Sequence, residues 1–569
     1  MAPLRSSLPL VPGPAISCAA RGLAGRGSRD ASPLSPVQPC SSRLGAAGSS
    51  PGGAVPGLGR PGAGTPSLLF GPHILILGLG ASGLAMARWC TREGARVTVA
   101  DTRAEPPQLV ALKQELPAVS FVHGPFSAAL IDGSDIKAVY VSPGLTPVEC
   151  APVSDAARAI GLPVAGELQL FSQALADLRA ARNYAPKVLA VTGTNGKTTV
   201  TSLTAQLVAR AGKIVAMAGN VGPTLLDTLT AQLDADALPE VWVLELSSFQ
   251  LDAASVFEPS AAALLNITQD HLDWHGSMPA YSRAKANIFG QQALLVLNRD
   301  DPAVMALLPE PVKSKGKQQY RSYVTFGADR PTRPGDFGIE ELNGIHWLVR
   351  ALEADETIRK RKVAEEELHI QRLMPSDALR IRGRHNALNA LAALALSHSA
   401  GCALGPLLFG LREYRGEPHR LESVAIVHEV EYFDDSKGTN VGATVAALTG
   451  LGLERRLVVI LGGEGKAQDF APLAPPVARH VRAVVLIGRA AAQIREALAA
   501  TGVALVGADS MEDAVAQASA LAQPGDAVLL SPACSSFDMF DNYEHRSRVF
   551  VAAVRETANA AGTALEGAQ

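Results

Sequence analysis

The feature that most constrains the fold is a set of short apolar runs alternating with segments of helical pattern. Residues 73–77 read HILIL, residues 188–192 read VLAVT, and similar runs occupy 241–246, 457–461 and 483–488. Apolar strands separated by helices are typical of parallel sheets that are covered on both faces, so the pattern predicts an α/β protein. Further strands are expected at 96–100, 213–217, 261–267, 293–297, 503–506 and 526–531, and helices at 81–93 and 198–211.

The strand–helix pattern occurs in three sets, and 569 residues accommodate several domains of about 150 residues. Hydrophobic residues make up 47% of the chain, which is enough for several cores. We expect three α/β domains: a Rossmann-like domain at 71–175, a P-loop ATPase-like domain with a parallel sheet at 176–416, and a second Rossmann-like domain at 417–560. The charged stretch at 350–372 carries no motif and is predicted to be a surface helix or an insertion.

Residues 1–70 differ in composition from the rest of the chain. Up to Leu69 there is no aromatic residue, no Lys and no Glu, and Gly, Pro, Ala and Ser dominate. Such a segment buries too little apolar surface to offset the entropy of ordering, so a disordered leader is predicted. Its arginines resemble those of a transit peptide; a tail without catalytic role, or an overextended start site, is the simpler interpretation.

Charge, cysteines and hydropathy exclude several classes of protein. The net charge of −3 is too small to imply a surface that binds polyanions, which argues against nucleic acid as a partner. The six cysteines form no CxxC pair, as expected in a reducing compartment. No stretch approaches the roughly 18 apolar residues that span a bilayer. We therefore expect a cytoplasmic protein without membrane insertion.

The first glycine-rich loop is Gly78-Leu-Gly80-Ala-Ser-Gly83, between an expected strand and helix, with Asp101 ending the next strand. Glycines at these positions allow a phosphate to approach a helix N-terminus, and the acid can hold a ribose. By itself the loop suggests NAD; a tight turn without a ligand is the alternative.

The second glycine-rich loop is TGTNGKTT at 192–199, again between strand and helix. A standard P-loop has glycine five residues before Gly196, where this chain has Val191, so Gly193 is expected to take the turn. Backbone amides would surround the phosphates, Lys197 would add a cation and Thr198 would reach Mg²⁺. The predicted ATP contacts from this loop are Gly193, Thr194, Asn195, Gly196, Lys197, Thr198 and Thr199.

Three further residues are expected near this loop. Glu245 closes the strand at 241–246, where a P-loop ATPase places a magnesium ligand. His271 follows the strand at 261–267 and reaches the same edge of the sheet. Lys285 falls in a short helix beyond His271, and spacing alone favours an ordinary solvated lysine.

Three polar segments in the last third of the chain follow expected strands: 434–440, 462–466 and 531–538. Open α/β sheets bind ligands at the carboxyl ends of their strands. Each segment could be only a capped turn. Together, their lysines and hydroxyls predict a pocket for a small anion such as an amino acid.

These residues resemble the Mur ligase family over about 72–555. The matching segments, in the family's order, are TGTNGKTT, ELSSFQLD, NITQDHLDWHG, RGRHNALNALAAL, PHRLE, DDSKGTN, GGEGK and SPACSSFDMFDNYEHRS. ELSSFQL and SPACSSFD are most similar to the D-glutamate-adding branch, whereas the ATP loop is shared with all Mur ligases and with folylpolyglutamate synthases. Glu464 stands where some relatives have Asp, and the leader has no counterpart.

The resemblance implies an ATP-dependent ligase with a UDP-binding first domain and a last domain that closes over the site. Its substrates would be UDP-N-acetylmuramoyl-L-alanine and D-glutamate, with ATP and two Mg²⁺ ions, and the enzyme would be a monomer. The implied catalytic residues are Lys197, Lys285 and His271. The implied contacts with the UDP-substrate are Gly80, Ser82, Asp101, Thr102, Arg103, Gly144, Asn220 and Ser247.

The resemblance also assigns the remaining ligands. The additional ATP contacts are Asn386, Asn389, Arg420 and Asp435. The amino-acid contacts are Lys437, Thr439, Ser536 and Phe537. The metal ligands are Thr198, Glu245, His271 and, if carbamylated, Lys285.

Three alternatives remain at this point. Another ATP-dependent Mur ligase or a folylpolyglutamate-type ligase shares the ATP loop. An NAD-dependent oxidoreductase fits GLGASG with Asp101 but leaves the ATP loop and Glu245 unexplained. A non-catalytic nucleotide-binding scaffold leaves the charged site residues without a role.

Overall fold

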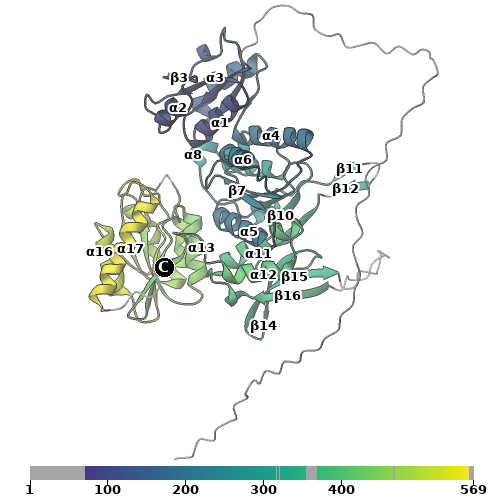
Figure 1. Cartoon of the computed structure of the whole chain (residues 1–569). Coiled ribbons are helices and arrows are strands. Elements are labelled where there is room, and N and C mark those ends of the chain that lie inside the picture. The colour runs from purple at the N-terminus through teal and green to yellow at the C-terminus, as the bar shows by residue number, and fades with distance from the viewer. Residues whose placement is uncertain are drawn as a thin grey trace, which may run out of the picture. The chain divides into compact units, whose positions relative to one another are not determined.

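The computed structural model describes residues 71–254, 256–314, 317–319, 321–353, 368–465 and 468–562. The predicted disordered leader, the middle of the charged stretch and Lys466 lie outside the described residues. Figure 1 shows sheets flanked by helices in three successive regions of the chain. No described helix combines the length and the apolar character that crossing a bilayer requires.

The first domain contains a five-stranded parallel sheet in the order β3-β2-β1-β4-β5. Its strands are β1 His73–Leu77, β2 Arg96–Asp101, β3 Ser120–His123, β4 Ile136–Val141 and β5 Val164–Ala165, and its helices are α1 Ala81–Arg92, α2 Leu109–Glu115 and α3 Pro147–Ala159. Strand order reverses between β1 and β4, which opens a crevice outside their carboxyl ends. The glycine loop follows β1 at that crevice.

Helix α4 Glu167–Arg182 leads to the central domain. It runs across residue 175, so the boundary expected there falls inside a helix. The helix ends with Asn183 in the left-handed conformation, at φ 54°. The chain leaves α4 there and enters the central sheet at residue 187.

The central sheet has nine strands in the order β16-β15-β14-β13-β10-β9-β6-β8-β7. They are β6 Lys187–Thr192, β7 Val215–Gly219, β8 Val241–Glu245, β9 Ala261–Leu264, β10 Leu294–Asn298, β13 Tyr323–Phe326, β14 Phe337–Leu342, β15 Ile345–Glu353 and β16 Leu368–Pro375; β11 Val312–Ser314 and β12 Lys317–Gln319 form a separate pair. The helices are α5 Lys197–Arg210, α6 Leu225–Asp234, α7 Ser248–Asp252, α8 Leu272–His275, α9 Met278–Ala286, α10 Pro302–Met305, α11 Arg384–Ser399 and α12 Leu404–Glu413.

For residues 350–372 a surface helix or an insertion was predicted, and the helix is wrong for the described parts. Residues 350–353 end β15 and residues 368–372 begin β16, and these two strands pair antiparallel. The charges misled the prediction because they lie on strands rather than on a helix: the Arg350 guanidinium covers the Phe337 ring at 5.5 Å. The Arg372 side chain donates to Glu340 at 2.9 Å.

The third domain contains a six-stranded sheet in the order β17-β18-β22-β19-β20-β21. Its strands are β17 Glu422–Val427, β18 Val430–Asp434, β19 Leu457–Gly462, β20 Val481–Ile487, β21 Ala504–Gly507 and β22 Ala527–Leu530, and its helices are α13 Val441–Leu451, α14 Ala474–His480, α15 Ala491–Leu498, α16 Met511–Leu521 and α17 Tyr543–Ala560. Strands β18, β22 and β19 are parallel neighbours. The three polar segments that follow them therefore start at one edge of the sheet, as predicted.

Candidate active site

The predicted ATP loop joins β6 to α5 at the carboxyl edge of the central sheet. Gly196 precedes α5 with φ +83°, and a Cβ atom there would lie 2.7 Å from Oδ1 of Asn389, so glycine is required. Asn195 is held by Asn266, which accepts from its backbone N–H at 2.8 Å and donates to its carbonyl oxygen at 3.0 Å. The loop thus ends at the N-terminus of α5, where a phosphate group binds favourably.

Lys197 lies within the loop it was predicted to serve. Its Nζ donates to the carbonyl oxygens of Gly193 at 3.0 Å and Thr194 at 2.8 Å. Loss of hydration lowers the pKa of Lys197, and the nearby Glu245 carboxylate opposes that shift. Gly193 has φ +156°, as expected for the residue that takes the turn. The side chain therefore lies beside the space that the loop encloses.

Glu245 ends β8, the strand next to β6, and is 1% exposed. Its Oε1 accepts from Nδ2 of Asn220 at 2.8 Å. Its Oε2 is buried without a hydrogen-bond partner among the described residues. An unpaired buried carboxylate oxygen costs on the order of 1–3 kcal/mol, so this position fits a cation that completes the coordination of Glu245.

His271 directly precedes α8 and adopts the left-handed conformation, at φ 52°. Its ring meets the Phe249 ring edge-on with centroids 4.7 Å apart, and its Nε2 lies 3.5 Å from the Asp270 carboxylate. Phe249 also stacks on His275 at 5.7 Å, and burial lowers the pKa of His275 to about 4. The Phe249 ring thereby fixes the imidazole of His271 at the carboxyl edge of the sheet.

Lys285 is 1% exposed and is not the solvated lysine that its spacing suggested. Its Nζ donates to the Gly193 carbonyl oxygen at 2.7 Å and lies 4.6 Å from the centre of the Tyr281 ring. Burial first, and then the charge of Lys197, hold the pKa of Lys285 well below its ordinary value. The structure therefore brings Lys285 to the same loop as Lys197 and favours its neutral amine.

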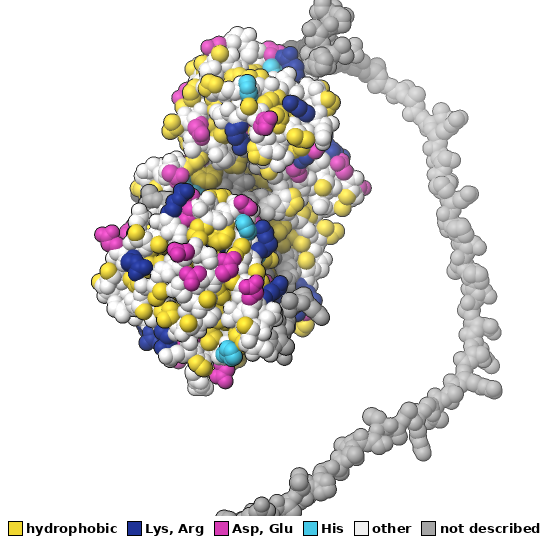
Figure 2. Space-filling model, turned by 90° about the vertical axis from the view of Figure 1, so that its left-hand side faces the viewer, with side chains coloured by type: hydrophobic (Ala, Val, Ile, Leu, Met, Phe, Trp, Pro, Cys, Tyr) yellow, Lys and Arg dark blue, Asp and Glu magenta, His cyan; other side chains and the backbone are white. Residues whose placement is uncertain are grey.

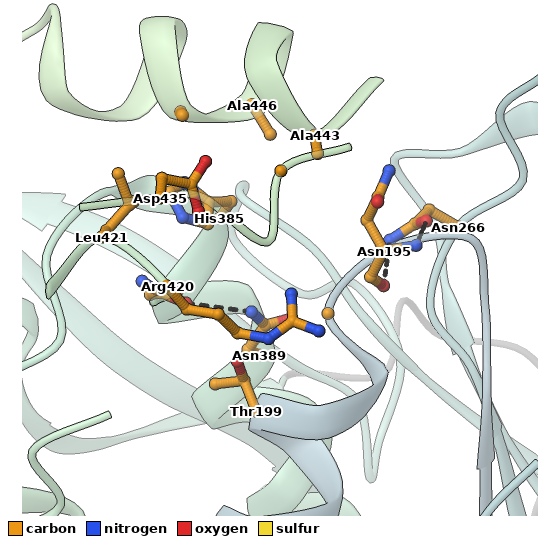
Figure 3. A pocket seen from close by; sticks show the side chains of 14 residues that line it. Asn195, Thr199, Asn266, His385, Asn389, Arg420, Leu421, Asp435, Ala443 and Ala446 are labelled. Atoms are coloured by element: carbon orange, nitrogen blue, oxygen red, sulfur yellow. Dashed lines mark hydrogen bonds between the residues drawn. The ribbon is translucent and has the colours of Figure 1, made fainter. Parts of the chain in front are cut away.

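A cavity adjoins the loop and contains the other residues assigned to ATP (Figure 3). It is lined by Asn195, Gly196, Thr199, Asn266, His385, Asn386, Asn389, Arg420, Leu421, Asp435, Gly438, Ala443, Ala446 and Ala447. Arg420 donates to Oγ1 of Thr198 at 3.0 Å, which joins the third domain to the loop. Burial raises the pKa of Asp435 to about 7, against a hydrogen bond from Ser531. The cavity adjoins the phosphate loop, and both polar and apolar side chains line it.

The first glycine loop is tied together by Asp101, which is fully buried. Asp101 accepts from the Leu79 N–H at 2.7 Å and from the Arg103 side chain at 2.8 and 2.9 Å. Burial alone would raise the pKa of Asp101, but hydrogen bonds from Arg103 and Leu79 lower it to about 2. Gly80 and Ser82 begin α1, while Thr102 and Gly144 are exposed. The predicted UDP contacts on the segments after β1 and β2 therefore lie around one turn that Asp101 shapes. Gly144 follows β4, and Asn220 and Ser247 lie in the central domain.

The predicted amino-acid contacts lie on the loops after β18 and β22. Lys437 Nζ lies 5.2 Å from the centre of the Tyr543 ring. Ser536 is buried, whereas Phe537 is 66% exposed. Thr439 is partly buried between Gly438 and Asn440. These loops therefore present one lysine, hydroxyls and an accessible aromatic ring.

Ser247 lies in the central domain and begins α7. It accepts from the Gln250 N–H at 3.2 Å, and Gln250 in turn accepts from the Ser247 N–H at 3.0 Å. This reciprocal capping explains the spacing of ELSSFQ after β8. Ser247 lies two residues after Glu245, and the cap fixes it at the start of α7.

Sequence reasoning missed two groups that hold the site together. Arg546 is fully buried and donates to the Ser436 carbonyl oxygen at 2.7 Å and to the Cys534 carbonyl oxygen at 3.1 Å, so it joins two substrate loops. Asn195 and Asn440 exchange side-chain amide hydrogen bonds at 3.1 and 3.3 Å across 245 positions. The segment NYEHRS had been noticed, but nothing in it distinguished Arg546 from a surface arginine.

Family models match all three domains. They are the Mur ligase MurD-like N-terminal domain at residues 72–166, the Mur ligase middle domain at 191–397 and the Mur ligase glutamate ligase domain at 419–534. Three α/β domains around a phosphate loop with these loops at their strand ends define a Mur-type ligase, and the chain belongs to the Mur ligase family.

Curated relatives narrow the similarity to one member of the family. The chain is 69% identical to the UDP-N-acetylmuramoylalanine–D-glutamate ligase of Albidiferax ferrireducens over 497 residues, which covers 87% of this chain and 98% of the relative. It is 58% identical to the ligase of that name from a Polaromonas species, covering 86% and 99%. The corresponding ligase of Burkholderia mallei is 57% identical, covering 87% and 99%.

Among solved structures, the MurF ligase of Thermotoga maritima in complex with ADP has a TM-score of 0.51 at 16% identity, covering 86% of this chain and 97% of that one. At this identity the similarity shows the fold alone. It confirms the predicted three-domain α/β class.

Proposed function

We infer that this chain is an ATP-dependent ligase that joins D-glutamate to UDP-N-acetylmuramoyl-L-alanine, a step of peptidoglycan precursor synthesis. The observation that carries this function is the 69% identity to a D-glutamate ligase over 98% of that enzyme's length. The ATP loop, Glu245 and Lys285 supply chemistry that an oxidoreductase or a non-catalytic scaffold would not use. A folylpolyglutamate-type ligase shares the loop but not the match of the first domain.

The reaction proceeds in two balanced steps. A carboxylate oxygen of the UDP-substrate attacks the γ-phosphorus of ATP, which forms an acyl phosphate and releases ADP. The amine of D-glutamate then attacks the acyl carbon, and the amide forms as phosphate leaves and the amine loses a proton. The loop amides and Lys197 stabilise the negative charge of the transferred phosphoryl group. The third domain, through Arg420, contacts the loop and helps to exclude water.

We propose that Thr198, Glu245, His271 and a carbamylated Lys285 hold two Mg²⁺ ions. Bound there, the ions would neutralise charge on the phosphates. The unpaired Oε2 of Glu245 supports this assignment. The neutral amine that burial favours at Lys285 is the form that can add CO₂.

The metal assignment predicts the behaviour of Glu245→Gln. We expect kcat to fall by about 10²-fold or more, because an amide replaces an anionic ligand. The melting temperature without Mg²⁺ should not fall, since Gln keeps the bond from Asn220 and removes an unpaired charge. Calorimetry should also show a loss of the Mg²⁺-dependent rise in melting temperature. A variant with wild-type Mg²⁺ dependence would remove Glu245 from the metal site.

We propose that Gly80, Ser82, Asp101, Thr102, Arg103, Gly144, Asn220 and Ser247 bind the UDP-substrate, with Asp101 acting through the turn it fixes. We propose that Lys437, Thr439, Ser536 and Phe537 bind D-glutamate. The loops after β18 and β22 support the second set, because they start side by side at one sheet edge. The remaining ATP contacts are proposed to be Asn386, Asn389, Arg420 and Asp435, which line one cavity.

The D-glutamate site predicts a selective effect of Lys437→Ala. Loss of one ammonium–carboxylate hydrogen bond should raise the KM for D-glutamate by about tenfold to a hundredfold. The KM for ATP should change by less than about twofold, because the lysine would contact only the amino acid. Steady-state kinetics with each substrate varied in turn provides the measurement, and equal effects on both constants would assign Lys437 a structural role instead.

The function is tested by phosphate release from ATP with UDP-N-acetylmuramoyl-L-alanine and a panel of amino acids. D-Glutamate should support turnover, whereas L-glutamate and D-aspartate should not, because one misplaces the amine and the other shortens the reach to Lys437. Release that needs no UDP-substrate, or that favours L-glutamate, would contradict the proposal.

We further propose that the protein is a cytoplasmic monomer with domains at 71–175, 176–416 and 417–560. Helix α4 runs across the first of these boundaries. Nucleic acid is not among its proposed partners. On the face in Figure 2, Lys and Arg side chains are interspersed with Asp and Glu, so that face presents no patch of a single sign. A small net charge of −3 agrees with this proposal.

A further inference from the structure

A triangle of hydrogen bonds lies behind the two cations assigned to ATP and to D-glutamate. We infer that His419, held by Asp434 and Ser547, is a positioning residue that orients Arg420 and Lys437 together. The inference rests on the proposed function, because it assigns Arg420 to ATP and Lys437 to the amino acid. Ser547 is the last residue of the matching segment SPACSSFDMFDNYEHRS, but the resemblance gave it no role.

The triangle is closed by three short contacts in the third domain. His419 Nδ1 lies 2.9 Å from Oδ2 of Asp434 and 2.7 Å from Oγ of Ser547. The Ser547 hydroxyl donates to the same Asp434 oxygen at 2.5 Å. Asp434 and Ser547 are buried, and Oδ1 of Asp434 accepts from the Ser436 N–H at 2.9 Å. The imidazole is thus fixed to a rigid strand end and to α17.

This arrangement differs from a nucleophilic triad. In such a triad the serine and the acid contact opposite nitrogens of the histidine, so that a proton can pass across the ring. Here both meet Nδ1 of His419, and Ser547 is 1% exposed. Glu422 accepts from the backbone N–H of His419 at 2.9 Å. A carboxylate oxygen of Glu422 also lies within 4.8 Å of a ring nitrogen of His419 and of a carboxylate oxygen of Asp434. Each group therefore fixes the position of His419.

The backbone around His419 needs such support. His419 has φ +63° and Leu421 has φ +48°, so two residues with side chains adopt the left-handed conformation in one short turn. Arg420 lies between them, and its guanidinium donates to Thr198 and lines the nucleotide cavity (Figure 3). Releasing the His419 ring would let this turn relax and withdraw Arg420.

His419 also contacts the D-glutamate loop. Its carbonyl oxygen accepts from the Lys437 N–H at 3.2 Å. The Tyr543 ring meets the His419 ring edge-on with centroids 6.0 Å apart and lies 5.2 Å from Lys437 Nζ. Asp434 itself ends β18, three residues before Lys437. One histidine is thus bonded to the segments that carry both cations.

Three substitutions separate this role from a general effect on stability. His419→Gly allows the left-handed backbone but removes the ring. His419→Asn also tolerates that backbone and offers an amide N–H where Nδ1 stood. His480→Ala is the matched control, because His480 is also buried in this domain and its Nδ1 contacts the Gly452 carbonyl oxygen at 2.8 Å, away from the substrate loops.

We expect H419G to raise the KM for ATP and for D-glutamate by about tenfold each, with the KM for the UDP-substrate within about twofold of wild type. H419N should restore both constants to within about threefold. H480A should leave all three constants unchanged even where it lowers the melting temperature. The inference is overturned if H419G matches wild type, if it alters one constant alone or all three equally, or if H419N is as impaired as H419G.

The same assay on the wild-type enzyme separates a failure of this inference from a failure of the proposed ligase function. A wild type that does not turn over D-glutamate would reject the ligase assignment. Calorimetric titration of ATP needs no turnover: the Kd of H419G should exceed that of H419N by several-fold if His419 orients Arg420. Equal nucleotide affinities would overturn the positioning role whatever the amino-acid substrate.

Discussion

Lys197→Ala is expected to lower kcat/KM for ATP by about 10³-fold or more, the scale on which single cations stabilise phosphoryl transfer. Lys197 is the first residue of α5, and its Nζ donates to the carbonyl oxygens of Gly193 and Thr194 in the loop. When phosphate fills the loop, that ammonium is the cation best placed to meet the transferred charge. Alanine removes the charge without opening an apolar core.

The matched control is Lys213→Ala. Lys213 follows the opposite end of α5, and its Nζ lies 3.9 Å from Glu240 on the surface. Both variants should keep the wild-type melting temperature, and only Lys197→Ala should lose ATP turnover in a phosphate-release assay. Near-normal turnover in Lys197→Ala would end the assignment of this loop to ATP.

Lys285→Ala is expected to be almost inactive, with kcat reduced by about 10³-fold. An ammonium at Lys285 would repel Mg²⁺ held by Glu245 and His271, whereas a carbamate would add an anionic oxygen ligand. Addition of CO₂ to the amine forms an N–C bond and releases a proton, and it requires the neutral amine. Burial and the nearby Lys197 lower the pKa of Lys285 and so favour that form.

Two measurements check this prediction. Acetate or another small carboxylate should partly restore Lys285→Ala, and wild-type activity should fall in buffer stripped of CO₂ and bicarbonate. Arg283→Ala, on the exposed side of the same helix α9, is the control and should respond to neither treatment differently from wild type. If Lys285→Ala kept wild-type rates in CO₂-free buffer, both the carbamate and the second-metal role would have to be abandoned.

The parts of the fold that were predictable have local signals. The strands at 73–77 and 188–192 are apolar apart from His73 and Thr192, and a glycine loop and a helix follow each one. That combination predicted the loop before Lys197 and the turn at Gly78. It also predicted that Glu245 lies at the same edge of the sheet as the loop, because parallel strands bring their carboxyl ends to one edge. Gly196 illustrates the physical reason: its positive φ and the close approach of Asn389 leave no room for a side chain.

The parts that were not predictable depend on contacts far apart in the sequence. Strands β15 and β16 carry charged side chains that cover aromatic and acidic partners on β14, and no local pattern distinguishes them from a helix. Lys285 appeared solvated because the carbonyl oxygen it bonds lies 92 positions away. The triangle at His419 requires Ser547, 128 positions further along the chain, and became apparent only in the structure.

The central claim, activation of a carboxylate as an acyl phosphate followed by amide formation, is tested most directly by oxygen transfer. UDP-N-acetylmuramoyl-L-alanine labelled with ¹⁸O in its carboxylate is incubated with the enzyme, ATP and D-glutamate, and the phosphate and the amide product are examined by mass spectrometry. The account predicts one ¹⁸O atom in each phosphate released, because the oxygen that attacks ATP leaves with phosphate. Phosphate without ¹⁸O, formed alongside the amide, would contradict it.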